Sequence, residues 1–383
     1  MWIDRKLLPT VEGHLEPGKA VILIGPRQVG KTTLLEKVTA DYRGKLLWMD
    51  CDEPDVRQRL TDATSSTLRA WIGDAGLVVI DEAQRVKNIG LTLKLFTDKI
   101  KSVKLLVTGS SSLDLANEIN EPLTGRKWEF MLLPISAEEM REHHGEMEER
   151  RLLSHRLVYG MYPEIINRPG KEQALLRQLS GSYLYKDIFT FHDVRKPEVI
   201  EKLLQSLALQ IGSEVNYHEL AQLTGSDQAT VQRYLNLLEK AFVVFRLPAF
   251  SRNLRNELKK SRKVYFYDNG IRNAIINSFQ PIDMRTDVGA LWENYLVSER
   301  TKWIANHQYF ANRYFWRTTQ QKEIDYLEEK DGKLFAFEFK WKPTAKVAFP
   351  KAFLTTYDHV ETAVISPENY MGFVAPEPSS TFI

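Results

Sequence analysis

The stretch GPRQVGKT at Gly25–Thr32 decides how the rest of the chain is interpreted. It matches the pattern G-x-x-x-x-G-K-[ST], in which glycines allow backbone N–H groups to wrap around a phosphate. The apolar run AVILI at Ala20–Ile24 precedes it, and TLLEKV, typical of a helix start, follows from Thr33. Because a phosphate-binding loop needs a strand before it and a helix after it, we predict a nucleotide site here.

The residues of this loop have separate expected roles. Lys31 supplies a positive charge for the β- and γ-phosphate oxygens, and the Thr32 hydroxyl is placed to ligate Mg²⁺. The helix N-terminus adds further positive potential. The residues expected to bind the nucleotide are Gly25, Pro26, Arg27, Gln28, Val29, Gly30, Lys31, Thr32 and Thr33. The predicted cofactors are therefore ATP and Mg²⁺.

A second motif, LVVIDE at Leu77–Glu82, is an apolar run that ends in two acids. Open α/β sheets bind ligands at the carboxyl ends of their strands. We expect Asp81 to hold Mg²⁺ and Glu82 to orient or deprotonate the attacking water. A strand at Lys45–Asp50 lies between the two motifs, an arrangement typical of P-loop ATPases with a catalytic Glu rather than of simple nucleotide kinases. The two motifs together predict ATP hydrolysis.

Three more residues are candidates for this site. The run LLVTGSS at Leu105–Ser111 ends in hydroxyl residues, and Thr108 or Ser110 could hydrogen-bond the attacking water or the γ-phosphate. The alternative for these two is a helix N-cap. Arg126, in LTGR before the last strand, could sense the γ-phosphate or reach a neighbouring subunit, with an ordinary surface arginine as the alternative.

Alternation of short apolar runs with helical stretches up to Pro134 predicts an α/β fold, with a parallel sheet covered on both faces. The expected strands are Ala20–Ile24, Lys45–Asp50, Leu77–Ile80, Lys104–Thr108 and Trp128–Leu133. We assign residues 1–133 to a P-loop ATPase domain. The charged, helix-rich residues 134–197 are assigned to a helical lid or linker.

Residues 198–263 are assigned to a winged-helix-like module. Helices are expected at Tyr217–Leu223 and Gln228–Lys240, followed by a strand at Phe242–Leu247. The second helix would present polar residues to a major groove, namely Gln228, Thr230, Gln232 and Arg233. A simple protein contact is the alternative.

A basic run from Arg252 to Lys263 follows this module. Its six cations are Arg252, Arg255, Lys259, Lys260, Arg262 and Lys263, against the single acid Glu257. Such a run could follow a phosphate backbone, although a solvated loop is the usual explanation. Because the run adjoins the module, double-stranded DNA is the expected partner.

Two strands around Asp331–Gly332 predict a hairpin with a two-residue type I′ turn. The implied register places Asp325 opposite Glu338, with Lys340 on the same side. Opposed carboxylates repel unless a cation lies between them, which favours a divalent metal, and Lys340 could stabilise charge on a scissile phosphate. The alternative is a solvated charged face on which Glu323 pairs with Lys340.

These motifs together resemble prokaryotic AAA-type ATPases that carry a GPRQxGKT loop, an Asp-Glu-x-Gln segment (here Asp81–Gln84), a TGSS strand end and an LxGR segment. The resemblance continues through GMYPE at Gly160–Glu164 and YLYKD at Tyr183–Asp187, and so covers nearly the whole chain. Such proteins carry a C-terminal domain of unknown function that is often likened to restriction-endonuclease-like nucleases.

The hairpin is similar to the PD-(D/E)xK nuclease core, which also uses a Glu on a preceding helix, a place that Glu293 fits. The resemblance implies that residues 264–383 form a nuclease-like α/β domain in which Glu293, Asp325 and Glu338 hold a second Mg²⁺ or Mn²⁺. The strict Pro-Asp dipeptide is missing before Asp325. The expected function is an ATPase coupled to a DNA-binding, DNA-cleaving C-terminal half. The alternative is a nucleotide-dependent switch whose nuclease-like domain is inactive.

Composition sets the remaining limits. The chain has 383 residues, 43% of them apolar and 27% charged, which is ordinary for a globular protein. The 52 basic and 50 acidic residues give a net charge of +2, so a polyanion site must be a local patch. The single cysteine, Cys51, excludes an intramolecular disulfide and fits a reducing compartment. No apolar run approaches the ~20 residues of a membrane span, so we expect a cytoplasmic protein.

Overall fold

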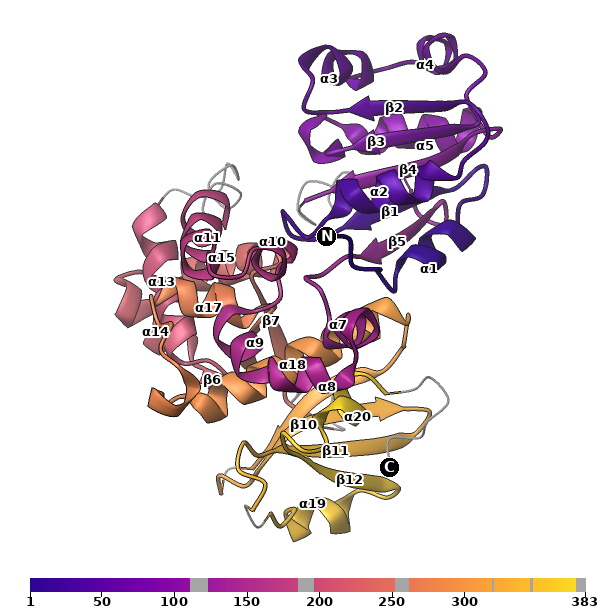
Figure 1. Cartoon of the computed structure of the whole chain (residues 1–383). Helices are drawn as coiled ribbons and strands as arrows, with labels where there is room; N and C mark the ends of the chain where they lie inside the picture. Colours follow the sequence, from indigo (N-terminus) through magenta and orange to yellow (C-terminus); the bar gives the residue numbers. More distant parts are fainter. Residues whose placement is uncertain (111–122, 185–195, 252–261, 319, 345–346, 377–383) are drawn as a thin grey trace. The chain divides into compact units, whose positions relative to one another are not determined.

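The computed structural model describes residues 1–110, 123–184, 196–251, 262–318, 320–344 and 347–376 (Figure 1). The chain forms two compact units, and each is described by itself. The first unit comprises Met1–Pro134 together with Lys240–Phe242 and Ala305–His307. The second comprises Ile135–Glu239, Val243–Ile304 and Gln308–Ile383.

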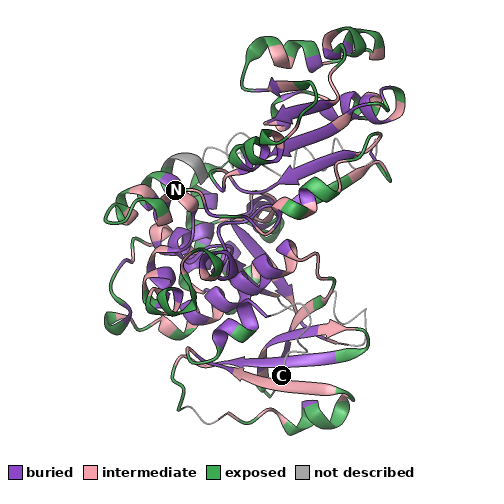
Figure 2. Cartoon of the chain, turned by 45° about the vertical axis from the view of Figure 1, so that its right-hand side comes forward, coloured by how far each residue is buried: buried purple, intermediate pink, exposed green. Residues whose placement is uncertain are grey.

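The first unit is built on a parallel five-stranded sheet in the order β2-β3-β4-β1-β5. Its strands are β1 (Ala20–Ile24), β2 (Leu46–Asp50), β3 (Leu77–Asp81), β4 (Lys104–Gly109) and β5 (Lys127–Met131). Strands β1 and β3 are buried along their whole length, as their apolar runs require (Figure 2). The predicted α/β fold is confirmed, with strand bounds within two residues of those expected.

One feature of the sheet order differs from the sequence-based expectation. The strand that lies between β1 and β3 is β4, whereas β2, the strand expected between the two motifs, lies at the sheet edge. Parallel strands are joined by crossovers, so neighbours in sequence need not be neighbours in the sheet. As a result Gly109, which ends β4, pairs with Ile24 immediately before the glycine-rich loop.

Helices flank this sheet, and their first turns explain two of their starts. They are α1 (Leu8–Gly13), α2 (Lys31–Ala40), α3 (Pro54–Leu60), α4 (Ser65–Ile72), the 3₁₀ turn η1 (Ala83–Arg85) and α5 (Ile89–Lys99). Proline stands at the first position of α3, where its missing N–H costs no hydrogen bond. Thr64 and Thr67 form a reciprocal capping pair at the start of α4.

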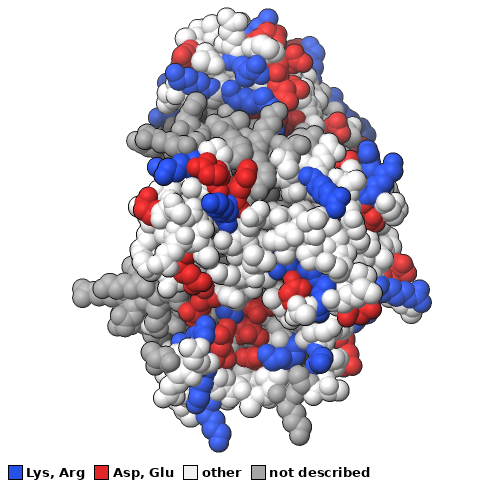
Figure 3. All heavy atoms as spheres, turned by 90° about the vertical axis from the view of Figure 1, so that its left-hand side faces the viewer, with Lys and Arg blue, Asp and Glu red and all other residues white. Residues whose placement is uncertain are grey.

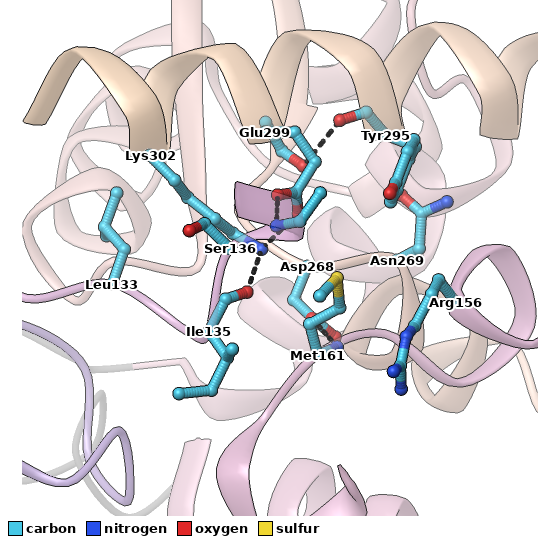
Figure 4. Close-up of polar contacts among 12 residues, drawn as sticks. Leu133, Ile135, Ser136, Arg156, Met161, Asp268, Asn269, Tyr295, Glu299 and Lys302 are labelled. Carbon is cyan, nitrogen blue, oxygen red and sulfur yellow. Dashed lines mark hydrogen bonds and ion pairs between the residues drawn. The ribbon is translucent and has the colours of Figure 1, made fainter. Parts of the chain in front are cut away.

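The second unit begins with helices, and among described residues 135–213 it has no strand, as expected. The helices are α7 (Ala137–His144), α8 (Glu146–Arg151), α9 (Leu153–Tyr159), α10 (Pro163–Asn167), α11 (Glu172–Gln178), the π-helical turn η2 (Leu179–Leu184) and α13 (Pro197–Leu209). Two side chains of the later helix α18 (Val288–Asn306) hold the start of this region (Figure 4). Lys302 Nζ donates to the Ile135 carbonyl at 3.1 Å, and Glu299 accepts from the Ala137 N–H at 2.6 Å.

A helix pair and a small antiparallel sheet follow. Helices α14 (Tyr217–Thr224) and α15 (Gln228–Lys240) match the predicted pair closely. The sheet has the order β6-β8-β7, with β6 (Glu214–Val215), β7 (Val244–Pro248) and β8 (Arg262–Phe266). The sequence predicts a domain boundary after residue 263. Strand β8 crosses this boundary, so its residues fall in both of the expected domains.

The last sheet has four strands in the order β12-β11-β10-β9. They are β9 (Asn312–Arg317), β10 (Glu323–Lys330), β11 (Lys333–Phe339) and β12 (Val360–Ile365), accompanied by α17 (Asn269–Ile275), η3 (Ile282–Met284), α18, α19 (Lys351–Thr356) and α20 (Tyr370–Val374). Tyr326 pairs with Phe337, which is the predicted hairpin register. Asp331 and Gly332 have φ values of 51° and 77°, as a type I′ turn requires.

Candidate functional site

Backbone geometry explains both glycines of the loop that joins β1 to α2. Gly25 has φ 157°, and a Cβ there would lie 2.0 Å from the Leu132 carbonyl oxygen. Gly30 caps α2 with φ 90°, in the left-handed region that favours glycine. The chain therefore needs glycine at these two positions to turn from the strand into the helix.

Lys31, the first residue of α2, lies across this loop. Its Nζ donates to the carbonyls of Gly25 at 3.0 Å and Pro26 at 2.8 Å, and the residue is 5% exposed. The helix N-terminus and the ammonium thus converge on one place at the carboxyl edge of the sheet. This arrangement fits an anion such as a triphosphate.

Asp81, which ends β3, joins two hydroxyl groups. Thr32 Oγ1 donates to its Oδ2 at 2.8 Å, and Thr108 Oγ1 donates to its Oδ1. Thr32 and Asp81 provide the hard oxygen atoms that Mg²⁺ prefers, so the residues present fit that ion. Thr108 is fully buried and its hydroxyl contacts the Asp81 carboxylate, a contact suited to orienting Asp81. Its expected contact with the attacking water or the γ-phosphate stays a prediction.

Glu82 has an unusual backbone conformation, with φ 52°. For a residue other than glycine this conformation is strained, and such strain is frequent at functional sites. Its N–H donates to Thr108 Oγ1 at 3.0 Å and to Asp81 Oδ1 at 3.1 Å. Thr108 Oγ1 and Asp81 Oδ1 therefore both bind the Glu82 N–H and hold this strained residue at the end of β3.

Gln84 has a role that the sequence reasoning missed, although the residue was part of the quoted motif. Its Nε2 donates to Glu82 Oε2 at 2.6 Å and to Ser110 Oγ at 2.9 Å. Its Oε1 accepts from the Ser110 N–H at 3.2 Å. Gln84 thus fixes the Glu82 carboxylate against the end of β4, and Ser110 contacts this amide.

Arg126 lies away from this edge, and its expected role within one chain is corrected. It precedes β5, whose first residue, Lys127, pairs with Ala20 at the start of β1. A five-residue strand at ~3.3 Å per residue places it about 16 Å from the glycine-rich loop. Its Nε lies 2.5 Å from Asp98 Oδ1. A γ-phosphate sensor in the same chain is excluded by this position, whereas reach into a neighbouring subunit stays a prediction.

Arg5 is a second residue that sequence reasoning missed, because no motif marks it. It is 5% exposed, and it donates to the Val29 carbonyl at 2.8 Å and the Leu133 carbonyl at 2.6 Å. It therefore fastens the glycine-rich loop to the segment that follows β5.

Helix α15 presents polar residues much as expected. Gln228, Gln232 and Arg233 are exposed, whereas Thr230 is half-buried and hydrogen-bonds to Asp227 at the start of the helix. Both positive and negative side chains are spread over the face seen in Figure 3, in keeping with the small net charge.

The structure describes only the last two cations of the basic run, Arg262 and Lys263. Arg252, Arg255, Lys259 and Lys260 lie outside the described residues. Arg262 is half-buried. Lys263 is 2% exposed, so the expectation that it contacts a phosphate backbone is wrong. The physical reason is its inward position on β8, where it pairs with acids.

The hairpin brings Asp325, Glu338 and Lys340 together, as predicted. Lys340 Nζ lies 2.7 Å from Glu338 Oε2 and 3.5 Å from Asp325 Oδ2. Burial and the nearby charge of Asp325 raise the pKa of Glu338 to about 7. The alternative pair of Glu323 with Lys340 is not formed, because Glu323 lies 2.5 Å from Lys263 Nζ instead.

Glu293 lies on α18, the helix that precedes the hairpin, as expected. Its Oε1 accepts from Lys263 Nζ at 2.9 Å and from the Tyr265 hydroxyl at 2.6 Å. The described residues contain no group of three or more acidic, His or Cys side chains that could hold a metal ion. The expected ligand set of Glu293, Asp325 and Glu338 is therefore not assembled as a metal site.

Comparison with known families divides the chain into three parts. Residues 17–141 match the family model of the AAA domain. Residues 150–281 and 288–370 match two domains of unknown function, DUF8612 and DUF4143. Within the described residues no helix has the length and apolarity to cross a membrane.

Two relatives of much of the chain are named as uncharacterized proteins. One from Mycobacterium tuberculosis is 28% identical over 339 residues, which cover 87% of this chain and 73% of the relative. One from Methanocaldococcus jannaschii is 22% identical over 262 residues, which cover 63% of this chain and 59% of the relative.

Solved structures give weaker matches. The RuvB Holliday junction branch migration motor of Thermotoga maritima matches with a TM-score of 0.31 and 16% identity, over 66% of this chain and 91% of that one. A similarity at this TM-score carries no argument. Residues 17–141 are similar to the AAA domain family, and within them the loop, Asp81 and Glu82 have the geometry of a P-loop nucleotide site.

Proposed function

We propose that the protein hydrolyses ATP with Mg²⁺ at the carboxyl edge of the five-stranded sheet and that the nucleotide state controls a nucleic-acid-binding second unit. The observation that carries the first half is the hydrogen-bonded set at this edge. Thr32 and Thr108 bind the two oxygens of Asp81, and Gln84 holds the Glu82 carboxylate. Each candidate group is thus fixed before the substrate arrives, as catalysis requires.

The roles follow from these contacts. Lys31 exchanges its two carbonyl partners for phosphate oxygens, and Thr32 and Asp81 hold Mg²⁺. The ion supplies neutralisation of phosphate charge when bound. Glu82 accepts a proton from the attacking water, and Gln84 keeps its carboxylate aimed while Ser110 anchors the amide.

For the second unit, we propose that it binds double-stranded DNA through a winged-helix-like module. It is supported by the exposed Gln228, Gln232 and Arg233 on α15 and by the antiparallel strands β7 and β8 that follow the helix pair. Polar side chains on one helix face are suited to contact base edges and phosphates.

A second candidate function is a nucleotide-dependent switch whose nuclease-like hairpin cuts nothing. The observation that favours it is Lys263 Nζ, which lies between Glu293 and Glu323 where the resemblance implies a metal. Under this candidate the ATPase site and the DNA contacts are unchanged, and the DNA cleavage that the nuclease resemblance implies does not occur.

The test measures ATP turnover and DNA binding together. We expect double-stranded DNA to raise the ATPase rate several-fold. Arg233→Glu should lower DNA affinity and reduce the salt dependence of binding by about one phosphate contact. Arg151→Glu is the matched control, because Arg151 is an exposed arginine on α8 that the proposal does not use. Turnover that DNA leaves unchanged, with Arg233→Glu binding as wild type, would refute the coupling.

A further inference from the structure

Four acids from two parts of the second unit meet at one place, and we name them the carboxylate cluster: Glu293, Glu323, Asp325 and Glu338. Glu293 comes from α18, and the other three come from the hairpin strands β10 and β11. Like charges this close destabilise each other unless cations lie among them. Two ammonium groups of the chain do so, and the Arg317 guanidinium lies 3.6 Å from Glu323 Oε2 at the edge of the cluster.

The first ammonium, that of Lys340, serves the outer half of the cluster. It contacts Glu338 at 2.7 Å and Asp325 at 3.5 Å, and its side chain is 33% exposed. The N–H of Phe339 also donates to Asp325, at 2.8 Å. Asp325 is therefore held by one backbone hydrogen bond and by the ion pair with Lys340.

The second ammonium, that of Lys263, serves the inner half. Its Nζ lies 2.5 Å from Glu323 Oε1 and 2.9 Å from Glu293 Oε1. Only 3% of its side chain is exposed. The Phe315 ring lies on another side, with its centroid 5.6 Å from Nζ, a distance at which an aromatic face attracts a cation.

Neighbouring elements fix the position of Lys263. Strand β8 pairs with β6 on one side and β7 on the other, so the Lys263 backbone is held in a sheet. The amide of Asn294 on α18 accepts from the Phe266 N–H at 2.7 Å and donates to its carbonyl at 3.1 Å. These two bonds dock the helix on β8, which places Glu293 beside Lys263.

A divalent ion in this cluster would need several oxygen atoms directed at one point about 2.0–2.6 Å away. Glu293 and Glu323 direct their oxygens at Lys263 Nζ instead. The residues present therefore fit an ammonium group rather than the metal that the nuclease resemblance implies.

We propose that Lys263 is the resident cation of the carboxylate cluster and takes the place of a divalent ion there. The cluster is then a closed, metal-independent element of the second unit, and metal-dependent DNA cleavage does not occur at it. The inference concerns the second unit alone and is independent of ATP hydrolysis in the first.

The test removes the ammonium while keeping the shape of the side chain. Lys263→Met retains the alkyl stem against Phe315 and leaves the four acids with only the Lys340 ammonium and the more distant Arg317 guanidinium. We expect nucleotide-free Lys263→Met to bind one Mn²⁺ at least tenfold more tightly than wild type, measured by electron paramagnetic resonance. Its melting temperature should rise with Mn²⁺, while that of wild type should not. All proteins carry Asp81→Asn, which removes the expected metal ligand of the ATPase domain.

Two controls separate charge from general damage. Lys263→Arg keeps the positive charge and should bind Mn²⁺ no better than wild type. Lys302→Met removes another buried lysine, which pairs with Glu299 at 2.5 Å, and should lower stability without a response to Mn²⁺. A folded Lys263→Met protein that does not bind Mn²⁺ would overturn the proposal.

A measurement on the unmutated cluster decides the matter if Lys263→Met does not fold. Lack of stoichiometric Mn²⁺ binding in the Asp81→Asn background supports Lys263 as the resident cation. Stoichiometric binding that Asp325→Asn abolishes would overturn the proposal, as would Mn²⁺-dependent nicking of DNA that Asp325→Asn removes.

Discussion

Replacing Glu82 with Gln separates nucleotide binding from hydrolysis. Gln has the same size, keeps the strained φ of 52°, and its amide oxygen can still accept from Gln84 Nε2. The Lys31 contacts with the loop are untouched. We therefore expect ATP affinity within about threefold of wild type, because no group expected to contact the phosphates changes.

The loss in rate should be large. An amide cannot accept the proton of the attacking water, and a positioned general base contributes roughly 10²–10⁴-fold. A hundredfold loss corresponds to about 2.7 kcal/mol of lost transition-state stabilisation. Lys31→Ala is the matched comparison, because it removes the main compensating charge at the phosphates and should abolish binding itself.

The assay is a titration with a fluorescent ATP analogue, combined with phosphate release at saturating ATP. Glu82→Gln should bind and fail to turn over, whereas Lys31→Ala should fail at binding. Equal loss of binding in both variants would refute the division of roles. So would a Glu82→Gln protein whose turnover at saturation stays within threefold of wild type.

Two further predictions concern stability. Burial raises the pKa of the Cys51 thiol to about 12, so at pH 8 only about one thiol in 10⁴ is the reactive thiolate. Ellman's reagent should therefore label the native protein slowly, at a rate that rises about tenfold per pH unit. Mg·ATP should slow labelling that proceeds through unfolding, whereas fast labelling of the native state would contradict the burial. Arg300 and Glu328 are fully buried and joined by two hydrogen bonds at 2.7 and 2.8 Å. Glu328→Gln alone should lower the free energy of unfolding, measured by chemical denaturation, by about 3–5 kcal/mol, because it leaves a buried charge unpaired. The double variant Arg300→Met/Glu328→Gln should lose much less, and equal losses would contradict the pairing.

Structural features that depend only on residues close together in the sequence could be predicted. The hairpin register followed from Asp331–Gly332 and the alternation of its strands, because both are local and one residue of slip would reverse every side chain. The same holds for the loop at Gly25–Thr32, because its glycines are required by a turn within one strand–helix unit. Asp325 beside Glu338 was foreseen for this reason.

Structural features that depend on the order of strands in the sheet could not be predicted. The order of strands along the chain does not determine that β4 lies between β1 and β3 in the sheet. That insertion puts Thr108 against Asp81 and Ser110 against Gln84. The γ-phosphate sensor role expected of Arg126 overlooked strand direction: β5 runs parallel to β1, so a residue that precedes β5 lies at the opposite edge of the sheet from the loop that follows β1.

Lys263 shows why charge runs are poor guides to function without the fold. Read beside Arg252–Arg262, it is one more cation of a basic segment, and its alternation with Val264 on β8 is too short to assign a face. Its partner Glu293 lies thirty positions away on α18, and the contact at 2.9 Å exists only because Asn294 binds the Phe266 backbone. A lysine removed from solvent in this way cannot contribute to the salt dependence of DNA binding, which counts only cations that displace counterions. It does determine the chemistry of the hairpin, because the same four acids would repel without it and attract a divalent ion in its absence.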